Sequence, residues 1–238
     1  MRKFRALLLS RVTAATAIAL LASLATIPIA LAAGHVTRHR ITDHFSGQSI
    51  DSSVWFFHDQ PGQVIISEGS GHVAVNVSSA ATNDFNAGLG TICKAGGDFD
   101  ARASFTLRTW PAHNGVWLSL QANDTNGFNT YRASVSWSTG DVYGSYLPPA
   151  GTTVPATDVG GMLRLVRKGN AWTSYYRAND DGVADDDWVA IASGAGPTND
   201  TSISLGVFNI SVATAFGGQN AIVEWNGFRL LADRIVCP

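Results

Sequence analysis

Apolar and polar residues alternate along most of the chain after residue 33, a pattern typical of strands that are buried on one face. In Asp98–Arg108 every second residue is apolar, and the residues between them are polar or charged. Val116–Gln121 alternates in the same way and places Trp117 on the side of Ser119 and Gln121. Similar runs predict further strands at Gln63–Glu68, His72–Val77, Gly88–Lys94, Thr130–Trp137, Val142–Leu147, Met162–Lys168, Trp172–Arg177, Trp188–Ala192, Ile203–Ile210 and Ala221–Leu231. No stretch after residue 33 keeps the helical spacing of apolar residues.

Pairs of turn-forming residues separate these runs, among them Gly96-Gly97, Asn126-Gly127 and Asp181-Gly182. Roughly a dozen short strands with one apolar face predict two packed antiparallel sheets. The fold class is therefore expected to be all-β, and no linker or internal repeat divides the sequence.

The N-terminal segment has the composition of an export signal. Basic residues lie within residues 2–11, and an apolar stretch follows from Val12 to Leu31. The stretch approaches the roughly 20 residues that span a bilayer, so a retained anchor is the alternative. Its alanine content, Pro28 and the small-x-small site Ala30-Leu31-Ala32 favour cleavage. We expect residues 1–32 to be a signal peptide and 41–234 to form the domain of a secreted, extracellular protein without membrane contact after cleavage.

The charge balance changes once this segment is removed. Without residues 1–32 the chain keeps 12 basic and 18 acidic residues, and the basic residues form no run. A net-acidic chain without a basic stretch argues against nucleic acid as a partner.

Both cysteines, Cys93 and Cys237, lie in the part expected to be exported. Two thiols in an oxidising compartment favour a disulfide, with two unrelated thiols as the alternative. They cannot build a zinc site by themselves, and the six histidines show no ligand spacing with them.

Several short motifs resemble a known family. They are Asp43-His44-Phe45-Ser46-Gly47 followed by Trp55, then Gly97-Asp98-Phe99-Asp100-Ala101, Gly161 to Gly169 around Leu163-Arg164-Leu165, Tyr175-Tyr176, Trp188, and Glu224-Trp225-Asn226-Gly227-Phe228. Over about residues 41–232 this order is similar to the concanavalin A-like lectin/glucanase superfamily, including modules appended to bacterial glycosidases. The resemblance implies a concanavalin A-like jelly-roll β-sandwich with one concave sheet, where many relatives bind or cleave glycans.

The motif that would make the chain a glucanase is missing. Glucanases of the superfamily carry two catalytic carboxylates on one strand as E-x-D-x-E, and glycoside hydrolysis generally uses such a pair. The chain has only two glutamates, Glu68 and Glu224, and neither has a carboxylate two residues away. The alginate-lyase sequences Gln-Ile-His and Arg-Thr-Glu are also absent. We therefore assign no catalytic residue, and keep as the alternative a hydrolase or lyase with an unrecognised acid–base pair.

The favoured function is non-catalytic binding of an extracellular glycan, because aromatic faces and planar polar groups suit sugar rings and hydroxyls. Four residues appear on the polar side of their strands and are expected to line one sheet: Trp117, Tyr143, Arg132 and Arg164. Trp110, in the loop before the strand of Trp117, is expected at the rim. Four other tryptophans are assigned to the core: Trp55, Trp172, Trp188 and Trp225. A structural or protein-binding sandwich, with these aromatic rings only covering arginine stems, is a further alternative.

An Asx-rich segment resembles a calcium loop. Asn179, Asp181 and Asp185 are its candidate metal ligands. Arg177 and Val189 stand where two key ligands belong, so a polar hairpin turn is the favoured interpretation. No cofactor is expected, with calcium as the one possibility.

Overall fold

Fifteen β-strands and no helix form the regular structure of the described residues. The computed structural model describes residues 38–58, 62–81, 85–124, 128–134, 140–147, 152–178, 187–209 and 219–238. Within these ranges nothing forms a helix of the length and hydropathy that a bilayer crossing requires. All strand pairs are antiparallel and make two sheets, which confirms the all-β jelly-roll sandwich expected from the alternation.

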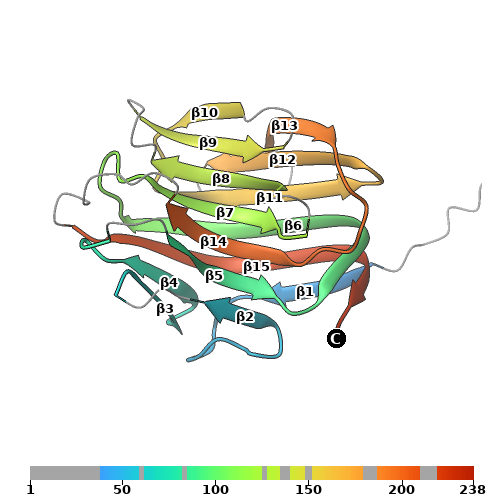
Figure 1. The fold of residues 1–238 in the computed structure, drawn as a ribbon, viewed down its shortest axis with the longest axis horizontal. Coiled ribbons are helices and arrows are strands. Elements are labelled where there is room, and N and C mark those ends of the chain that lie inside the picture. The colour runs from blue at the N-terminus through green and yellow to red at the C-terminus, as the bar shows by residue number, and fades with distance from the viewer. Residues whose placement is uncertain are drawn as a thin grey trace, which may run out of the picture. The chain divides into compact units, whose positions relative to one another are not determined.

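The larger sheet has eight strands, in the order β13-β12-β11-β6-β15-β4-β3, and β1 also pairs with β15 (Figure 1). Their bounds are β1 His39–Asp43, β3 Val64–Gly69, β4 His72–Val77, β6 Lys94–Thr109, β11 Gly160–Lys168, β12 Ala171–Ala178, β13 Val189–Ala195 and β15 Ala221–Val236. The long strand β15 pairs with β6 on one side, and with β4 and then β1 on the other.

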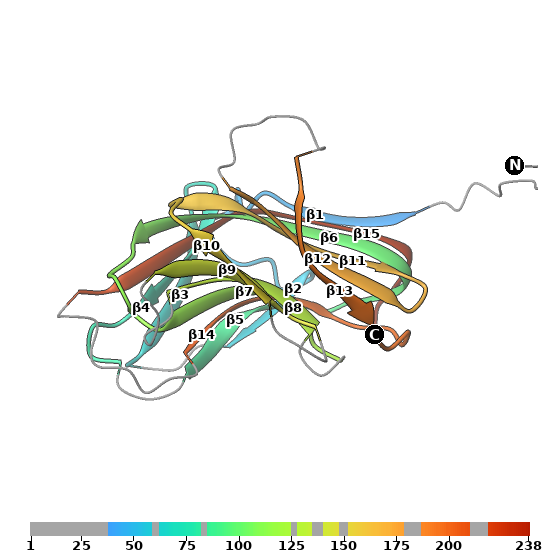
Figure 2. The same cartoon turned by 90° about the horizontal axis from the view of Figure 1, so that it is seen from above.

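The second sheet has seven strands, in the order β10-β9-β8-β7-β14-β5-β2, so β7 is its central strand. Their bounds are β2 Trp55–His58, β5 Phe85–Thr91, β7 Val116–Ala122, β8 Phe128–Ser134, β9 Asp141–Tyr146, β10 Thr152–Ala156 and β14 Ile203–Asn209. Seen from above, the two sheets form separate layers, with β1, β6 and β15 in one and β5, β7 and β14 in the other (Figure 2).

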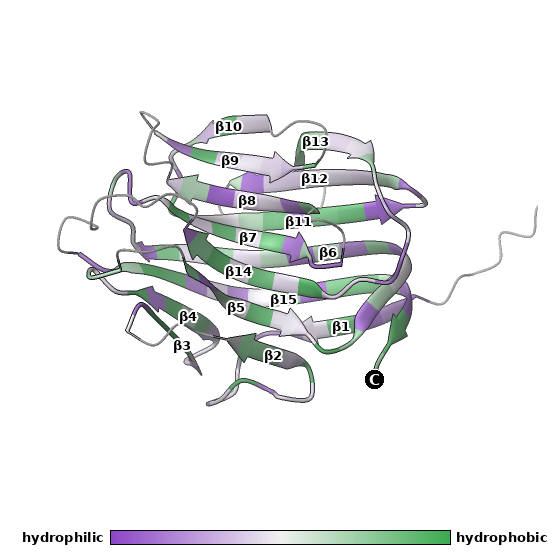
Figure 3. Cartoon of the chain, in the orientation of Figure 1, coloured by the Kyte–Doolittle hydropathy of each residue, from purple (hydrophilic) through white to green (hydrophobic). Residues whose placement is uncertain are grey.

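The core lies between the inner faces of the two sheets. Apolar and polar segments alternate along the strands, as the colouring of Figure 3 shows. Trp55, Trp172 and Trp225 are buried in this core, as the sequence predicts. Trp188 is not part of it, which corrects that assignment. Its half-buried ring faces the guanidinium groups of Arg102 and Arg164 at 5.5 and 5.2 Å.

Some strand boundaries differ from the expected ones. The run Gly88–Lys94 was expected as one strand, but β5 ends at Thr91 and β6 begins at Lys94, so the chain changes sheets inside it. Strands β1, β2 and β10 are also present where no strand was expected. Pro155 lies in β10, and a proline is compatible with that strand because β10 is an edge of the sheet.

The first of the family motifs forms a structural corner. The Asp43 carboxylate accepts hydrogen bonds from the Phe45 N–H at 2.8 Å and from the Trp55 indole N–H at 2.8 Å. Phe45 has a positive φ of 51° and is fully buried. The motif therefore fixes the entry of the chain into the sandwich, which explains why it indicates the fold and not an activity.

The disulfide between Cys93 and Cys237 is present, which confirms the predicted pairing. Cys93 lies in the short connection between β5 and β6, and Cys237 directly follows β15. The bond closes a loop of 144 residues and joins the passage between the sheets to the end of the last strand.

Candidate functional site

The outer face of the seven-stranded sheet carries the candidate site. In its central strand β7, Val116, Leu118 and Leu120 are fully buried in the core. Trp117 and Gln121 are half-buried on the opposite side, and Ser119 lies between them. A strand has a side-chain period of two, so these three residues follow one another along one face.

Three aromatic rings cluster on this face. The ring of Trp117 lies 4.3 Å from that of Tyr131 on β8 and 5.7 Å from that of Phe208 on β14, between centroids. We call Trp117, Tyr131 and Phe208 the aromatic cluster. Burial raises the pKa of Tyr131 to about 12, so its hydroxyl stays protonated at neutral pH and can donate a hydrogen bond.

A groove with glycines at its floor lies beside this cluster. Its floor is formed by Gly88 and Gly90 of β5 and Gly206 of β14, and we call it the glycine groove. A Cβ at Gly88 would stand 2.2 Å from the backbone oxygen of Leu205, so only glycine fits the close approach of the two strands. The ring of Phe56 covers Gly90, where an added Cβ would lie 2.2 Å from it.

Uncharged polar side chains border the glycine groove. They are Asn86, Gln121, Asn123 and Ser204. The Ser204 hydroxyl donates to Oδ1 of Asn123 at 2.7 Å, and Nδ2 of Asn123 donates to the Ser202 hydroxyl at 3.2 Å. These bonds orient the Asn123 amide, and amide and hydroxyl groups of this kind both donate and accept hydrogen bonds.

The aromatic cluster and the glycine groove contain no carboxylate among their described residues. On the other sheet, Asp98 and Asp100 stand two positions apart on β6, but both are engaged. Asp98 accepts from the Gly169 N–H at 2.6 Å, and Asp100 binds the guanidinium groups of Arg102 and Arg164. Burial favours a raised pKa for Asp100, but the two arginines outweigh it and lower the pKa, so this group is not poised as an acid.

Two predicted binding residues lie inside the sandwich, so their expected place on the outer face is wrong. Tyr143 is fully buried, its ring stacks on Tyr176 at 4.1 Å, and its hydroxyl donates to the Asp158 carboxylate. Arg132 is 1% exposed and donates to the Asp141 carboxylate at 2.9 Å. The Tyr143 hydroxyl and the two Nη atoms of Arg132 donate to carboxylates and backbone carbonyls, and these bonds offset the burial of both side chains.

The remaining predicted residues do not gather either. Arg164 lies on the outer face of the eight-stranded sheet, next to Asp100. Trp110 packs against the core and donates its indole N–H to Asp141 at 2.7 Å. Of the five predicted binding residues only Trp117 lies on the candidate face, and its part in binding stays a prediction.

Sequence reasoning missed most of this site. Tyr131 and Phe208 were not predicted as site residues, because the sequence does not show that their strands flank β7. The alternation of glycine with apolar residues in Ala87-Gly88-Leu89-Gly90 is a signal for a flat outer face that the sequence offers.

The candidate calcium ligands Asn179, Asp181 and Asp185 lie outside the described residues. Within the part of the chain that the structure describes, no group of three or more histidine, cysteine or acidic side chains is placed to hold a metal ion.

Several solved structures share this architecture. No protein-family model matches the chain, and no curated protein matches it in sequence. The apo Crh5 transglycosylase is similar with a TM-score of 0.58 at 12% identity, over 82% of this chain and 85% of that one. A β-1,3-glucanase from Mycobacterium marinum gives 0.54 at 13% identity, over 80% and 97%.

A third structure is described as Rv0315, an immunostimulatory antigen and pseudo β-1,3-glucanase of Mycobacterium tuberculosis. Its TM-score is 0.55 at 14% identity, over 81% of this chain and 98% of that one. Identities this low show the fold alone. The two antiparallel sheets and these likenesses show that the chain has a concanavalin A-like sandwich fold.

Proposed function

We propose that this protein binds a glycan without cleaving it, on the outer face of its seven-stranded sheet. One observation carries the proposal. The side chains of Trp117, Ser119 and Gln121 occupy alternate positions on the outer face of the central strand β7, with Ser119 fully buried, and this is the spacing that an E-x-D-x-E motif would use for its carboxylates. Without a carboxylate there, the strand supplies neither a general acid nor a nucleophile for glycoside hydrolysis.

The surroundings of β7 suit a neutral sugar chain. Apolar ring faces of the sugars can stack on the aromatic cluster, and the amides of Gln121 and Asn123 can bond hydroxyls. At Gly88 and Gly206 the floor of the glycine groove has no side chains, and the ring of Phe56 covers Gly90 as a further flat apolar surface. The part of this face that the structure describes therefore favours an uncharged glycan over an acidic one.

The names of the structural neighbours suggest the first ligand to test. One is a β-1,3-glucanase and another a pseudo β-1,3-glucanase, so β-1,3-glucan is the substrate class with which to begin. Export by the N-terminal segment would bring the protein to such polymers outside the cell.

The test combines binding and turnover on the same polymers. The secreted protein is incubated with insoluble β-1,3-glucan, cellulose and chitin, and both the bound fraction and the released reducing sugar are measured. Binding without release is the expected result. Release of reducing sugar would establish the enzyme instead, and absence of both would favour a structural sandwich.

Variants locate the surface that binds. Trp117→Ala and Gln121→Ala should each reduce the bound fraction. Ile65→Ala is the control, because Ile65 is 64% exposed on a strand of the other sheet. Equal losses in all three variants would contradict the assigned face.

A further inference from the structure

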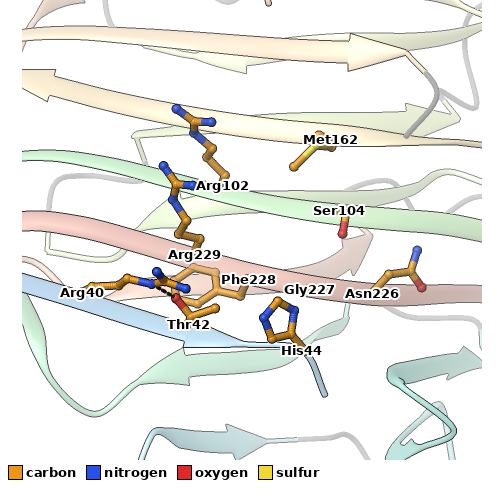
Figure 4. A pocket seen from close by; sticks show the side chains of 10 residues that line it. All are labelled: Arg40, Thr42, His44, Arg102, Ser104, Met162, Asn226, Gly227, Phe228 and Arg229. Atoms are coloured by element: carbon orange, nitrogen blue, oxygen red, sulfur yellow. Dashed lines mark hydrogen bonds between the residues drawn. The ribbon is translucent and has the colours of Figure 1, made fainter. Parts of the chain in front are cut away.

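Three arginines stand directly opposite one another on the outer face of the eight-stranded sheet. Arg229 on β15 pairs with Arg102 on β6, and Arg102 pairs with Arg164 on β11. We call Arg229, Arg102 and Arg164 the arginine row. Neighbouring strands are about 4.8 Å apart, so the row sets cationic side chains at short intervals across the sheet. Figure 4 shows the guanidinium groups of Arg102 and Arg229 extending in the same direction.

Among the described residues, a carboxylate compensates the end of this row formed by Arg102 and Arg164. Asp100 bridges Arg102 and Arg164, with its Oδ2 atom 2.9 and 2.7 Å from their Nη2 atoms. Within the described part of the chain Arg229 has no ion pair, and Arg40 on the adjacent strand β1 bonds the hydroxyl of Thr42. Like charges directly opposite on neighbouring strands destabilise a sheet. The Arg229–Arg102 neighbourhood therefore costs stability, and a ligand that binds Arg229 would relieve the repulsion.

A groove of about 400 Å³ opens beside Arg229, Arg102 and Arg40. A β-bulge in β15 between Trp225 and Gly227 places a residue without a side chain opposite Ser104, which hollows the surface. Ser104 and Asn226 add uncharged hydrogen-bonding groups to the lining.

We propose that this groove binds the carboxylate groups of an acidic polysaccharide. Asp100 already shows that a carboxylate fits between two neighbouring arginines of the row. Arginine binds carboxylates with two parallel hydrogen bonds, which gives both geometry and strength. A line of cations favours a ligand with repeated anionic groups over a single small anion. The hydroxyl and amide groups beside the row suit the hydroxyls of sugar units.

This site is separate from the proposed neutral-glycan site. The arginine row lies on the outer face of one sheet, and the aromatic cluster lies on the outer face of the other. The two proposals rest on different residues, so either can fail without the other.

The experiment measures binding of the secreted protein to polygalacturonate, with laminarin as a neutral polymer and heparin and polyphosphate as other polyanions. Titrations at low and high salt should show polygalacturonate binding that weakens with salt, since exposed charges are screened. Arg229→Ala should weaken it about tenfold, and Arg40→Ala combined with it should weaken it further. Lys168→Ala removes the same charge from the exposed end of β11, outside the groove, and should leave binding unchanged.

Folding is monitored beside binding. Arg229→Ala should leave Tm unchanged or raise it, because it removes a like-charge contact with Arg102. A lowered Tm would show a structural role and overturn the proposal. The proposal is also overturned if polygalacturonate does not bind at low salt, or if Lys168→Ala weakens binding as much as Arg229→Ala does. Binding of heparin and polyphosphate as tight as that of polygalacturonate would overturn it too. Trp117→Ala should not change the binding of polygalacturonate, and this distinguishes the result from the test of the neutral-glycan site.

Discussion

The indole of Trp117 and the phenol of Tyr131 lie 4.3 Å apart, centroid to centroid, on the neighbouring strands β7 and β8, and both side chains point away from the core. An added Cβ at Gly144 would stand 2.3 Å from the Tyr131 ring, so this ring lies flat against the next strand. The pair is thus held by the sheet in one arrangement before any ligand arrives. A preorganised aromatic surface loses little conformational freedom when a ligand binds it.

Trp117→Ala is expected to weaken binding to the neutral glycan about tenfold, which corresponds to about 1.4 kcal/mol. The free energy of unfolding should fall by only about 1 kcal/mol, the value of a lost aromatic contact. Trp172→Ala, in the fully buried core, should instead cost about 3–5 kcal/mol. Titration with the glycan measures the loss of binding, and urea unfolding measures the change in the free energy of unfolding. A loss at Trp117 as large as at Trp172 would show that its ring serves the fold first.

Gly88→Ala is expected to destabilise the protein by about 1–3 kcal/mol. The added methyl group would meet the Leu205 backbone oxygen at 2.2 Å, so β5 and β14 must separate. Binding should weaken too, because Gly206 of the same groove moves with β14. Gly140→Ala is the matched control, with nothing within 4 Å of the added Cβ. Urea midpoints that change equally in both variants would contradict the close-approach explanation.

Replacing both cysteines by alanine should lower the free energy of unfolding by about 5 kcal/mol, the upper value of the chain-entropy account for a loop of this length. The bond spans 144 residues, so its removal frees most of the unfolded chain. Urea unfolding of the variant and the wild type measures the difference. Alkylation of the native wild type should find no free thiol, and two reactive thiols would refute the bond.

Asp100→Asn should remove part of the acid sensitivity of the protein. Although burial acts against it, the hydrogen bonds and charges of Arg102 and Arg164 lower the pKa of Asp100 in the folded state. A lowered folded pKa gives stability that is present above the unfolded pKa of about 3.9 and is lost as pH falls through the folded pKa. The wild type should therefore melt above Asp100→Asn near pH 6, and the two Tm values should converge toward pH 2. A difference that is constant with pH would contradict the ion-pair explanation.

The sandwich could be predicted from the sequence because a strand that is buried on one face has apolar and polar residues at alternate positions. The sequence also identified the disulfide, since the expected compartment and the cysteine count leave few alternatives. The assignment of Arg132 and Tyr143 failed for a physical reason. All seven residues of β8, the strand of Arg132, are buried, and Tyr143 is buried on β9 together with its next two residues, so polarity does not tell the two faces of these strands apart.

The location of the site could be derived only from the order of the strands in the sheets. Gly88 and Gly206 are far apart in the chain and meet only because β5 pairs with β14. The alternation of polar and apolar residues places Arg164 and Trp117 on the outer faces of their strands. Both side chains do point outward, but from different sheets. Alternation reports which face of a strand is exposed, and it carries no information on which sheet the strand joins.

The position of the disulfide also determines how the protein would carry a mechanical load. A pull on the chain at Pro238 reaches Cys237 first, and the covalent bond passes it to Cys93, between the two sheets. The last strand, β15, therefore cannot be unzipped from its C-terminal end, residue by residue, away from β6. A protein held by a polymer on its sheets and tugged at its tail would resist by shear across whole strands, which is the stronger direction of a β-sheet.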